Sequence, residues 1–117
     1  MQRMTRLGLA TGALAALALP FAAFAAAGDP EPAPALTAEQ VTKGRQLFTD
    51  NGCNACHTLA DADAAGSIGP AFDGNPNLDK GHVINIINNG QGAMPSFSWL
   101  DTADIDLLAS YIVQTKK

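Results

Sequence analysis

The stretch Cys53-Asn54-Ala55-Cys56-His57 has the pattern C-x-x-C-H and contains both cysteines of the 117-residue chain. This pattern is the attachment sequence of a c-type haem. Two cysteines three positions apart lie about one helical turn apart, so both thiols can form thioethers with the same porphyrin. The adjacent histidine offers an imidazole to the iron. The motif therefore predicts one covalently attached haem c.

Two other interpretations use the same cysteines. A C-x-x-C pair also occurs in thiol–disulfide oxidoreductases, but this chain lacks the βαβ pattern in which that motif usually lies. A structural zinc site needs four ligands, which Cys53, Cys56, His57 and His82 could supply. No second paired motif supports zinc, so covalent haem is the favoured interpretation.

The first 25 residues have the parts of a secretory signal peptide. Arg3 and Arg6 form a basic region, residues 7–24 form an apolar run, and Ala23-Phe24-Ala25 fits a cleavage site. Cleavage after Ala27 is a second candidate. An uncleaved membrane anchor is the alternative, because the run nearly reaches the ~20 residues of a membrane span. We expect residues 1–25 to be removed and the mature protein to be periplasmic, because bacteria attach haem c outside the cytoplasm.

The remaining residues are enough for one small domain. Alternating prolines in residues 26–36 predict a disordered, Pro-rich linker, and residues 37–117 are expected to form the domain. Beyond residue 25 the chain has five Lys and Arg against eleven Asp and Glu, a net charge of −6. This charge argues against nucleic acid as a partner.

Three segments have the periodicity of helices, and no stretch alternates like a strand. The first is expected over residues 38–50, after a capping box that begins at Thr37 and before Gly52 as its stop. The second is expected over residues 80–89 after Asp79, and the third over residues 102–115 after Asp101. Glycines and prolines make residues 58–77 irregular. The sequence thus predicts an all-α fold.

Residues 37–117 resemble the class I cytochromes c of the small bacterial monohaem kind. Four elements in the family's order carry the resemblance: C-x-x-C-H directly after a helix, Ile68-Gly69-Pro70, Gly92-Ala93-Met94-Pro95-Ser96-Phe97, and Leu100-Asp101-Thr102-Ala103-Asp104-Ile105 at the start of the last helix. The resemblance implies the class I cytochrome c fold, with three to four helices wrapped around one covalently attached haem. It also implies that the first and last helices cross, with Gly44 and Phe48 against Leu108 and Tyr111.

The resemblance implies that His57 and Met94 are the two axial ligands of the iron. Met94 is the only methionine after residue 25, and a methionine thioether raises the reduction potential of a haem. Two alternatives stay open: Met94 fills core space, or His82 is the sixth ligand. The carbonyl of Pro70 would accept a hydrogen bond from the non-ligating nitrogen of His57 and fix its ring.

The sequence is compatible with more than one role for several polar residues. Any of Asn85, Asn88 and Asn89 could donate a hydrogen bond to Met94 or to a haem propionate. The indole of Trp99 either bonds a propionate, as in some relatives, or packs under the last helix. The sequence does not choose among these roles.

The implied function is periplasmic transfer of single electrons, without enzymatic activity, because two axial ligands leave the iron no open position. The implied partners are redox proteins such as a periplasmic dehydrogenase, a cytochrome complex or a terminal oxidase. A membrane is a partner only if the signal peptide is retained. The acidic excess predicts a partner whose contact face is basic or apolar.

Two alternative functions remain. The chain could be a dedicated cytochrome subunit of a periplasmic dehydrogenase, which has the same chemistry and a single partner. It could also be a haem-based protein that reacts with a gas or a peroxide, which requires Met94 to leave the iron.

Overall fold

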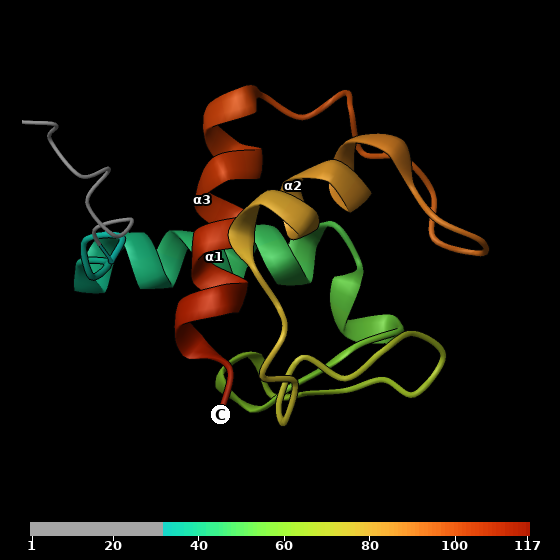
Figure 1. Ribbon diagram of the computed structural model, residues 1–117, viewed down its shortest axis with the longest axis horizontal. Coiled ribbons are helices and arrows are strands. Elements are labelled where there is room, and N and C mark those ends of the chain that lie inside the picture. The colour runs from blue at the N-terminus through green and yellow to red at the C-terminus, as the bar shows by residue number, and fades with distance from the viewer. Residues whose placement is uncertain (1–31) are drawn as a thin grey trace, which may run out of the picture. The chain divides into compact units, whose positions relative to one another are not determined.

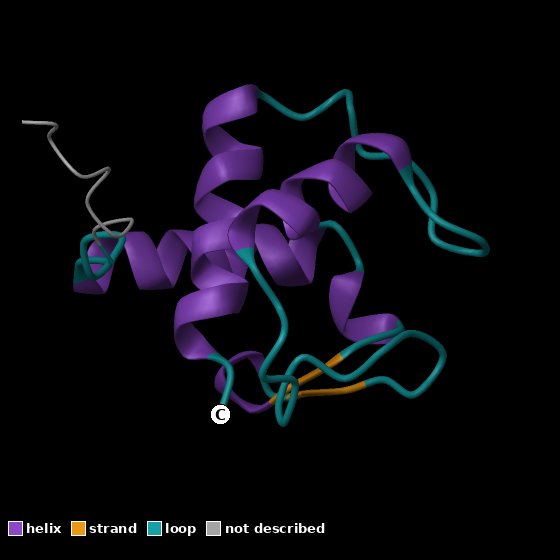
Figure 2. Ribbon diagram, viewed as in Figure 1, coloured by secondary structure: helices purple, strands orange, loops and turns teal. Residues whose placement is uncertain are grey.

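Three helices and a short two-stranded ladder make up the fold (Figure 1 and Figure 2). The computed structural model describes residues 32–117. The helices are α1 (Ala38–Asp50), α2 (Lys80–Asn89) and α3 (Thr102–Thr115), and two short 3-10 turns follow α1: η1 (Cys53–Ala55) and η2 (Ala60–Ala62). The expected helix bounds and the all-α class are confirmed. The expected signal peptide and residues 26–31 of the expected linker lie outside the described residues.

Capping groups fix where the helices begin and end. Thr37 Oγ1 accepts from the backbone N–H of Gln40 at 3.2 Å, and Gln40 Oε1 accepts from the N–H of Thr37 at 2.9 Å, which is the expected capping box. Asp79 caps α2 through its side chain, as expected. Asp101 occupies the N-cap position of α3, but its side chain makes no capping hydrogen bond, so that expectation is wrong. At Gly52 a φ of 74° ends α1 and turns the chain into η1.

Residues 58–77 contain a ladder that the sequence did not predict. Strand β1 (Thr58–Leu59) pairs antiparallel with β2 (Ala64–Ala65), with Thr58 opposite Ala65 and Leu59 opposite Ala64. Strands of two residues are too short to show an alternation of apolar and polar residues, which is why the sequence shows no strand pattern here. The ladder begins one residue after His57 and carries Leu59 fully into the core.

α1 and α3 cross at a contact that leaves no room for a side chain on α1. A Cβ atom at Gly44 would lie 2.5 Å from the Cβ of Tyr111. One turn further along α1, Phe48 packs edge-on against Tyr111, with ring centroids 6.3 Å apart. Phe48, Tyr111 and Leu108 are buried. The expected crossing of the first and last helices is therefore confirmed, and α2 also packs on α3.

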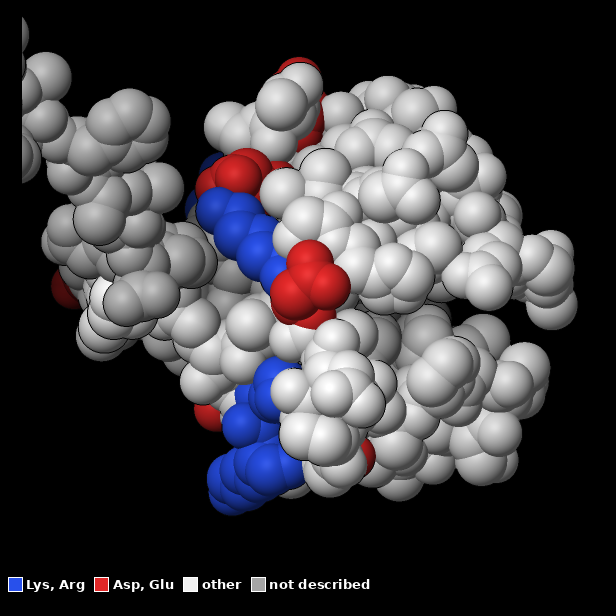
Figure 3. Space-filling model, viewed as in Figure 1, with Lys and Arg blue, Asp and Glu red and all other residues white. Residues whose placement is uncertain are grey.

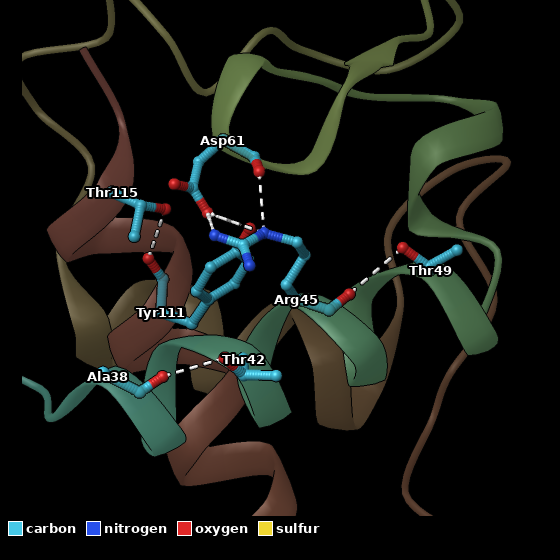
Figure 4. Close-up of polar contacts among 7 residues, drawn as sticks. All are labelled: Ala38, Thr42, Arg45, Thr49, Asp61, Tyr111 and Thr115. Atoms are coloured by element: carbon cyan, nitrogen blue, oxygen red, sulfur yellow. Dashed lines mark hydrogen bonds and ion pairs between the residues drawn. The ribbon is translucent and has the colours of Figure 1, made fainter.

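One carboxylate fastens the segment after β1 to both crossing helices (Figure 4). Asp61 Oδ2 accepts from the Tyr111 hydroxyl at 2.6 Å and from Arg45 Nη2 at 2.8 Å, and Arg45 Nε donates to the backbone carbonyl of Asp61 at 2.8 Å. The hydroxyl of Tyr111 and the guanidinium of Arg45 hold the pKa of Asp61 below its usual range. Burial and the bond to Asp61 raise the pKa of Tyr111. The segment that follows His57 is thus tied to α1 and to α3.

The residues just before α1 are also bound to α3. The N–H of Leu36 donates to Gln114 Oε1 at 3.0 Å, and Gln114 Nε2 donates to the carbonyl of Pro34 at 3.2 Å. Leu36 packs against the core. The last residues of the expected linker therefore contact the domain, while the boundary itself stays a prediction. Within residues 32–117 no helix has the length and apolar character needed to cross a membrane.

We predict that Gly44→Ala destabilises the protein by about 1–3 kcal/mol, because the new methyl group overlaps Tyr111 and forces the helices apart. Urea unfolding measures the change. Gly81→Ala is the matched control: the nearest atom to its new Cβ is a carboxylate oxygen of Asp79 at 3.3 Å, so we expect an effect within about 1 kcal/mol. Equal effects of the two substitutions would contradict the tight crossing.

We predict that Asp61→Asn lowers the free energy of unfolding by about 1–3 kcal/mol near pH 7, because it removes the charge that Arg45 and Tyr111 bind. The pKa of Asp61 is lowered by folding, so its contribution is complete above the unfolded value of about 4 and is lost as the pH falls through the folded value. Urea unfolding of both proteins between pH 7 and acid should show the two curves converging.

Asp63→Asn is the control for this experiment. Asp63 lies two residues after Asp61 and its side chain is exposed, so the substitution removes the same charge from a position in contact with solvent. We expect its effect to stay within about 0.5 kcal/mol. A difference between Asp61→Asn and the parent protein that does not shrink in acid would contradict the role of the carboxylate.

Candidate functional site

A cavity of about 860 Å³ is bounded by the segment after α1, by α2 and by the loop that joins α2 to α3. In Figure 1 that loop and the segment after α1 lie on the same side of the crossed helices, and Figure 3 shows the surface hollowed there. Protein interiors are densely packed with few voids, so a cavity of this size in a small domain marks a ligand site.

All five site residues that the sequence predicted line this one cavity: Cys53, Cys56, His57, Pro70 and Met94. Most of the remaining lining is apolar and comes from four parts of the chain, namely the segment before α2, α2, the following loop and α3: Ile68, Phe72, Leu78, Val83, Ile86, Ile87, Phe97 and Ile112. The cavity thus combines a mostly apolar wall with a small set of sulfur and nitrogen donors.

The two thiols are presented by the tight turn η1. The N–H groups of Cys56 and His57 both donate to the carbonyl of Cys53, at 3.2 and 3.0 Å. Both cysteines are half-buried and free. Burial raises the pKa of Cys53 to about 11, whereas reactive redox cysteines have lowered pKa values. The thiol–disulfide interpretation is therefore not supported.

The zinc interpretation also finds no support. Within residues 32–117, no three side chains of His, Cys, Asp or Glu come together in a group that could hold a metal ion. His82, the fourth ligand of that hypothesis, lies exposed in the first turn of α2, where it lines the cavity.

The ring of His57 is buried and held by three neighbours. Its Nδ1 lies 2.7 Å from the carbonyl oxygen of Pro70. Since a carbonyl can only accept, Nδ1 donates this hydrogen bond and Nε2 keeps a free lone pair for a metal. Phe72 stacks on the ring, with centroids 4.4 Å apart and planes at 15°. A Cβ at Gly69 would lie 2.6 Å from His57 Cε1.

Two of these neighbours had no role in the sequence analysis. Gly69 was noted only as part of Ile68-Gly69-Pro70. The absence of a side chain at this position was the one signal that the backbone could approach another group closely. Phe72 carried no signal, because nothing in the order of residues brings it to His57. These contacts fix the orientation of the imidazole.

Met94 lies on a loop whose backbone is fixed by its own hydrogen bonds. Gln91 and Met94 exchange two backbone hydrogen bonds of 3.0 Å, and the N–H of Phe97 donates to the carbonyl of Ile87 at 2.8 Å. Gly90 has a φ of 69°, and a Cβ there would lie 2.6 Å from the Met94 carbonyl. The thioether is therefore carried by a preformed loop, on a segment separate from that of His57.

The structure narrows the roles of the remaining polar residues. The side-chain amides of Asn88 and Asn89 donate to the carbonyls of Ile84 and Asn85, each at 2.9 Å, so they stay on α2. Trp99 is 71% exposed, so the expectation that it packs under the last helix is wrong. The alternative role of Trp99 at a haem propionate stays open.

The residues around the cavity fit a c-type haem. The two thiols suit covalent attachment, His57 Nε2 and the Met94 thioether are both ligands that haem iron accepts, and the apolar wall suits a porphyrin. The fit follows from the chemistry of the donor set and from the glycine that makes space beside His57.

We predict that Gly69→Ala displaces the His57 ring and weakens its bond to Pro70, because the new methyl group overlaps the imidazole. The haem-loaded variant should have a changed reduction potential and a lower yield of attached haem. Ser67→Ala, an exposed position two residues earlier, is the control. An unchanged potential and yield in Gly69→Ala would contradict the positioning role of this glycine.

Comparisons with known proteins identify the family of the chain. The sequence model of the family described as "Cytochrome C oxidase, cbb3-type, subunit III" matches residues 39–112. Cytochrome c6 of Cyanidium caldarium is 35% identical over 77 residues, which cover 60% of this chain and 66% of that protein. Cytochrome c6 of Cyanidioschyzon merolae (strain NIES-3377 / 10D) is 34% identical over 88 residues, which cover 68% of this chain and 80% of that protein. This chain thus spans just under two thirds of the first relative's length.

A solved structure shows the same arrangement. The c-type cytochrome SorU from Sinorhizobium meliloti is similar with a TM-score of 0.60 and 34% sequence identity, and the match covers 66% of this chain and 91% of that one. The chain belongs to the cytochrome c family, as a small monohaem class I cytochrome c with one covalently attached haem that serves electron transfer.

Proposed function

We propose that this cytochrome is a periplasmic carrier that passes single electrons between redox proteins and catalyses no reaction itself. The observation that carries the proposal is the position of His57 and Met94, which line one cavity from two separately fixed segments. With an imidazole and a thioether as axial ligands, the iron has no position open to a substrate.

When bound, haem c supplies an iron that takes up and gives away one electron at a time. Cys53 and Cys56 would anchor it through their sulfurs, and His57 and Met94 would supply the axial ligands. Pro70, Phe72 and Gly69 hold the His57 ring, and the backbone bonds of Gln91 hold the Met94 loop. These contacts would limit the movement of both side chains when the iron gains or loses an electron, which would favour electron transfer with little rearrangement.

The expected signal peptide supports a periplasmic location, in which haem attachment takes place. A periplasmic dehydrogenase, a cytochrome complex or a terminal oxidase is the class of partner that fits there. The matching family is named for a subunit of an oxidase, which supports a terminal oxidase as electron acceptor. A dedicated dehydrogenase subunit would differ only in having one partner, and copurification with that enzyme would reveal it.

We predict that the haem-loaded protein shows a methionine–iron charge-transfer band when oxidised and no spectral shift with carbon monoxide when reduced. Met94→Ala should lose the band, lower the reduction potential and bind carbon monoxide, because it removes a neutral thioether ligand that favours ferrous iron. His82→Ala tests the alternative sixth ligand and should keep the band and the six-coordinate spectrum.

Visible spectra with and without carbon monoxide, together with potentiometry, decide between the outcomes. Carbon monoxide binding by the unchanged protein would favour the gas- or peroxide-reacting alternative. Loss of the six-coordinate spectrum in His82→Ala, with Met94→Ala unchanged, would assign the sixth ligand to His82.

A further inference from the structure

Phe72 stacks on the ring of His57 and restrains a movement that the hydrogen bond to Pro70 leaves open. That bond holds the imidazole along the line from Nδ1 to the carbonyl oxygen, at 2.7 Å, but it allows the ring to tilt about this line. The phenyl ring of Phe72 lies 4.4 Å from the imidazole, with the two planes at 15°, and opposes the tilt. The tilt of His57 therefore depends on where Phe72 is held.

Phe72 is itself held by its backbone and by its edge. Its N–H donates to the carbonyl of Thr58 at 3.0 Å, and its carbonyl accepts from the N–H of Asn75 at 3.2 Å. Its ring meets Phe48 edge-on, with centroids 6.1 Å apart and planes at 71°. Phe48 is fully buried on α1. Phe72 thus connects the core of the helix crossing to the imidazole.

The next residue, Asp73, joins segments that are far apart in the sequence. Asp73 Oδ2 accepts from the N–H of Ala60 in η2 at 2.7 Å, and Oδ1 accepts from the N–H of Lys117 at 2.9 Å. The N–H of Gly74 donates to the main-chain oxygen of Lys117 at 2.6 Å. In Figure 1 the residues after α3 lie beside this loop. The turn that carries Phe72 is therefore bound both to η2 and to the residues after α3.

Asp73 does not line the cavity and is none of the predicted ligands. Both of its carboxylate oxygens bind backbone N–H groups, and such charge-assisted hydrogen bonds are stronger than neutral ones. Lys116 Nζ donates to the carbonyl of Asn75 at 2.7 Å, so the residues after α3 also fix the far end of the turn. A carboxylate that bridges two backbone segments restrains the turn between them, whereas a carboxylate bound only to water would leave it free.

We propose that Asp73 is a positioning residue for the axial histidine: it holds Phe72 against His57 and thereby sets the tilt at which the imidazole meets the iron. The inference rests on the ligation by His57 in the proposed function. Neighbours that orient a metal-bound histidine also tune the metal. The residues after α3 thus act on the iron through Asp73, although they lie outside the cavity lining.

The test is the proton NMR spectrum of the oxidised, haem-loaded protein, in which the haem methyl resonances shift with the plane of the axial imidazole. Phe72→Leu keeps an apolar side chain but removes the flat ring, and Asp73→Ala removes both acceptors. We expect both variants to shift the methyl resonances and to change the reduction potential. Asp50→Ala is the control, because it removes a carboxylate at the exposed end of α1, outside the cavity lining, and should keep the methyl resonances of the parent.

The double variant separates positioning from a general loss of stability. If Asp73 acts through Phe72, adding Asp73→Ala to Phe72→Leu should leave the methyl resonances as they are in Phe72→Leu alone. Shifts that simply add would overturn the proposal, as would parent-like resonances in Asp73→Ala or an equal shift in Asp50→Ala. Asp73→Asn, which keeps one carbonyl acceptor, takes the place of Asp73→Ala if that variant does not fold.

The same samples separate this inference from the proposed function. A parent protein without a six-coordinate haem spectrum would refute the proposed ligation. A six-coordinate parent spectrum, combined with unshifted methyl resonances in Asp73→Ala, would refute only the role of Asp73.

Discussion

At the crossing of α1 and α3, Gly44 lets the helices approach so closely that Tyr111 occupies the space a side chain would need. The two segments that carry the predicted ligands are connected to these helices. The His57 segment leaves the end of α1 and is bound back to the crossing through Asp61, Arg45 and Tyr111 (Figure 4). The Met94 loop connects α2, which packs on α3, to the start of α3 itself. The two segments that carry the predicted ligands are thus connected to the crossed helices, and both line the same cavity.

The ligands are held by backbone and ring contacts more than by charge. Pro70 orients His57 through its carbonyl, Phe72 stacks on the imidazole, and Gln91 pairs with Met94 through the backbone. Such contacts fix the positions of the two side chains within the fold. The assignment to electron transfer rests on the family to which the chain belongs, and the fixed positions of His57 and Met94 agree with it.

The acidic excess of the chain does not extend to the cavity. The chain beyond residue 25 has a net charge of −6, yet the cavity lining has no Lys, Arg, Asp or Glu. The charge of the chain and the chemistry of the cavity therefore come from different residues, and the composition does not show which residues line the cavity.

The sequence by itself determined the three helices and the chemistry, but not the β1–β2 ladder. Caps and apolar periodicity placed the three helices, and C-x-x-C-H with the resemblance to class I cytochromes c named the haem and its predicted ligands, because these signals depend on residues close together in the chain. Only the tertiary structure decided what depends on distant residues: the Asp61 link to Arg45 and Tyr111, the stacking of Phe72 on His57, the exposure of Trp99, and the cavity lining without Lys, Arg, Asp or Glu. The physical reason is that such contacts form between segments whose spacing is set by the helix crossing and not by local conformational preference.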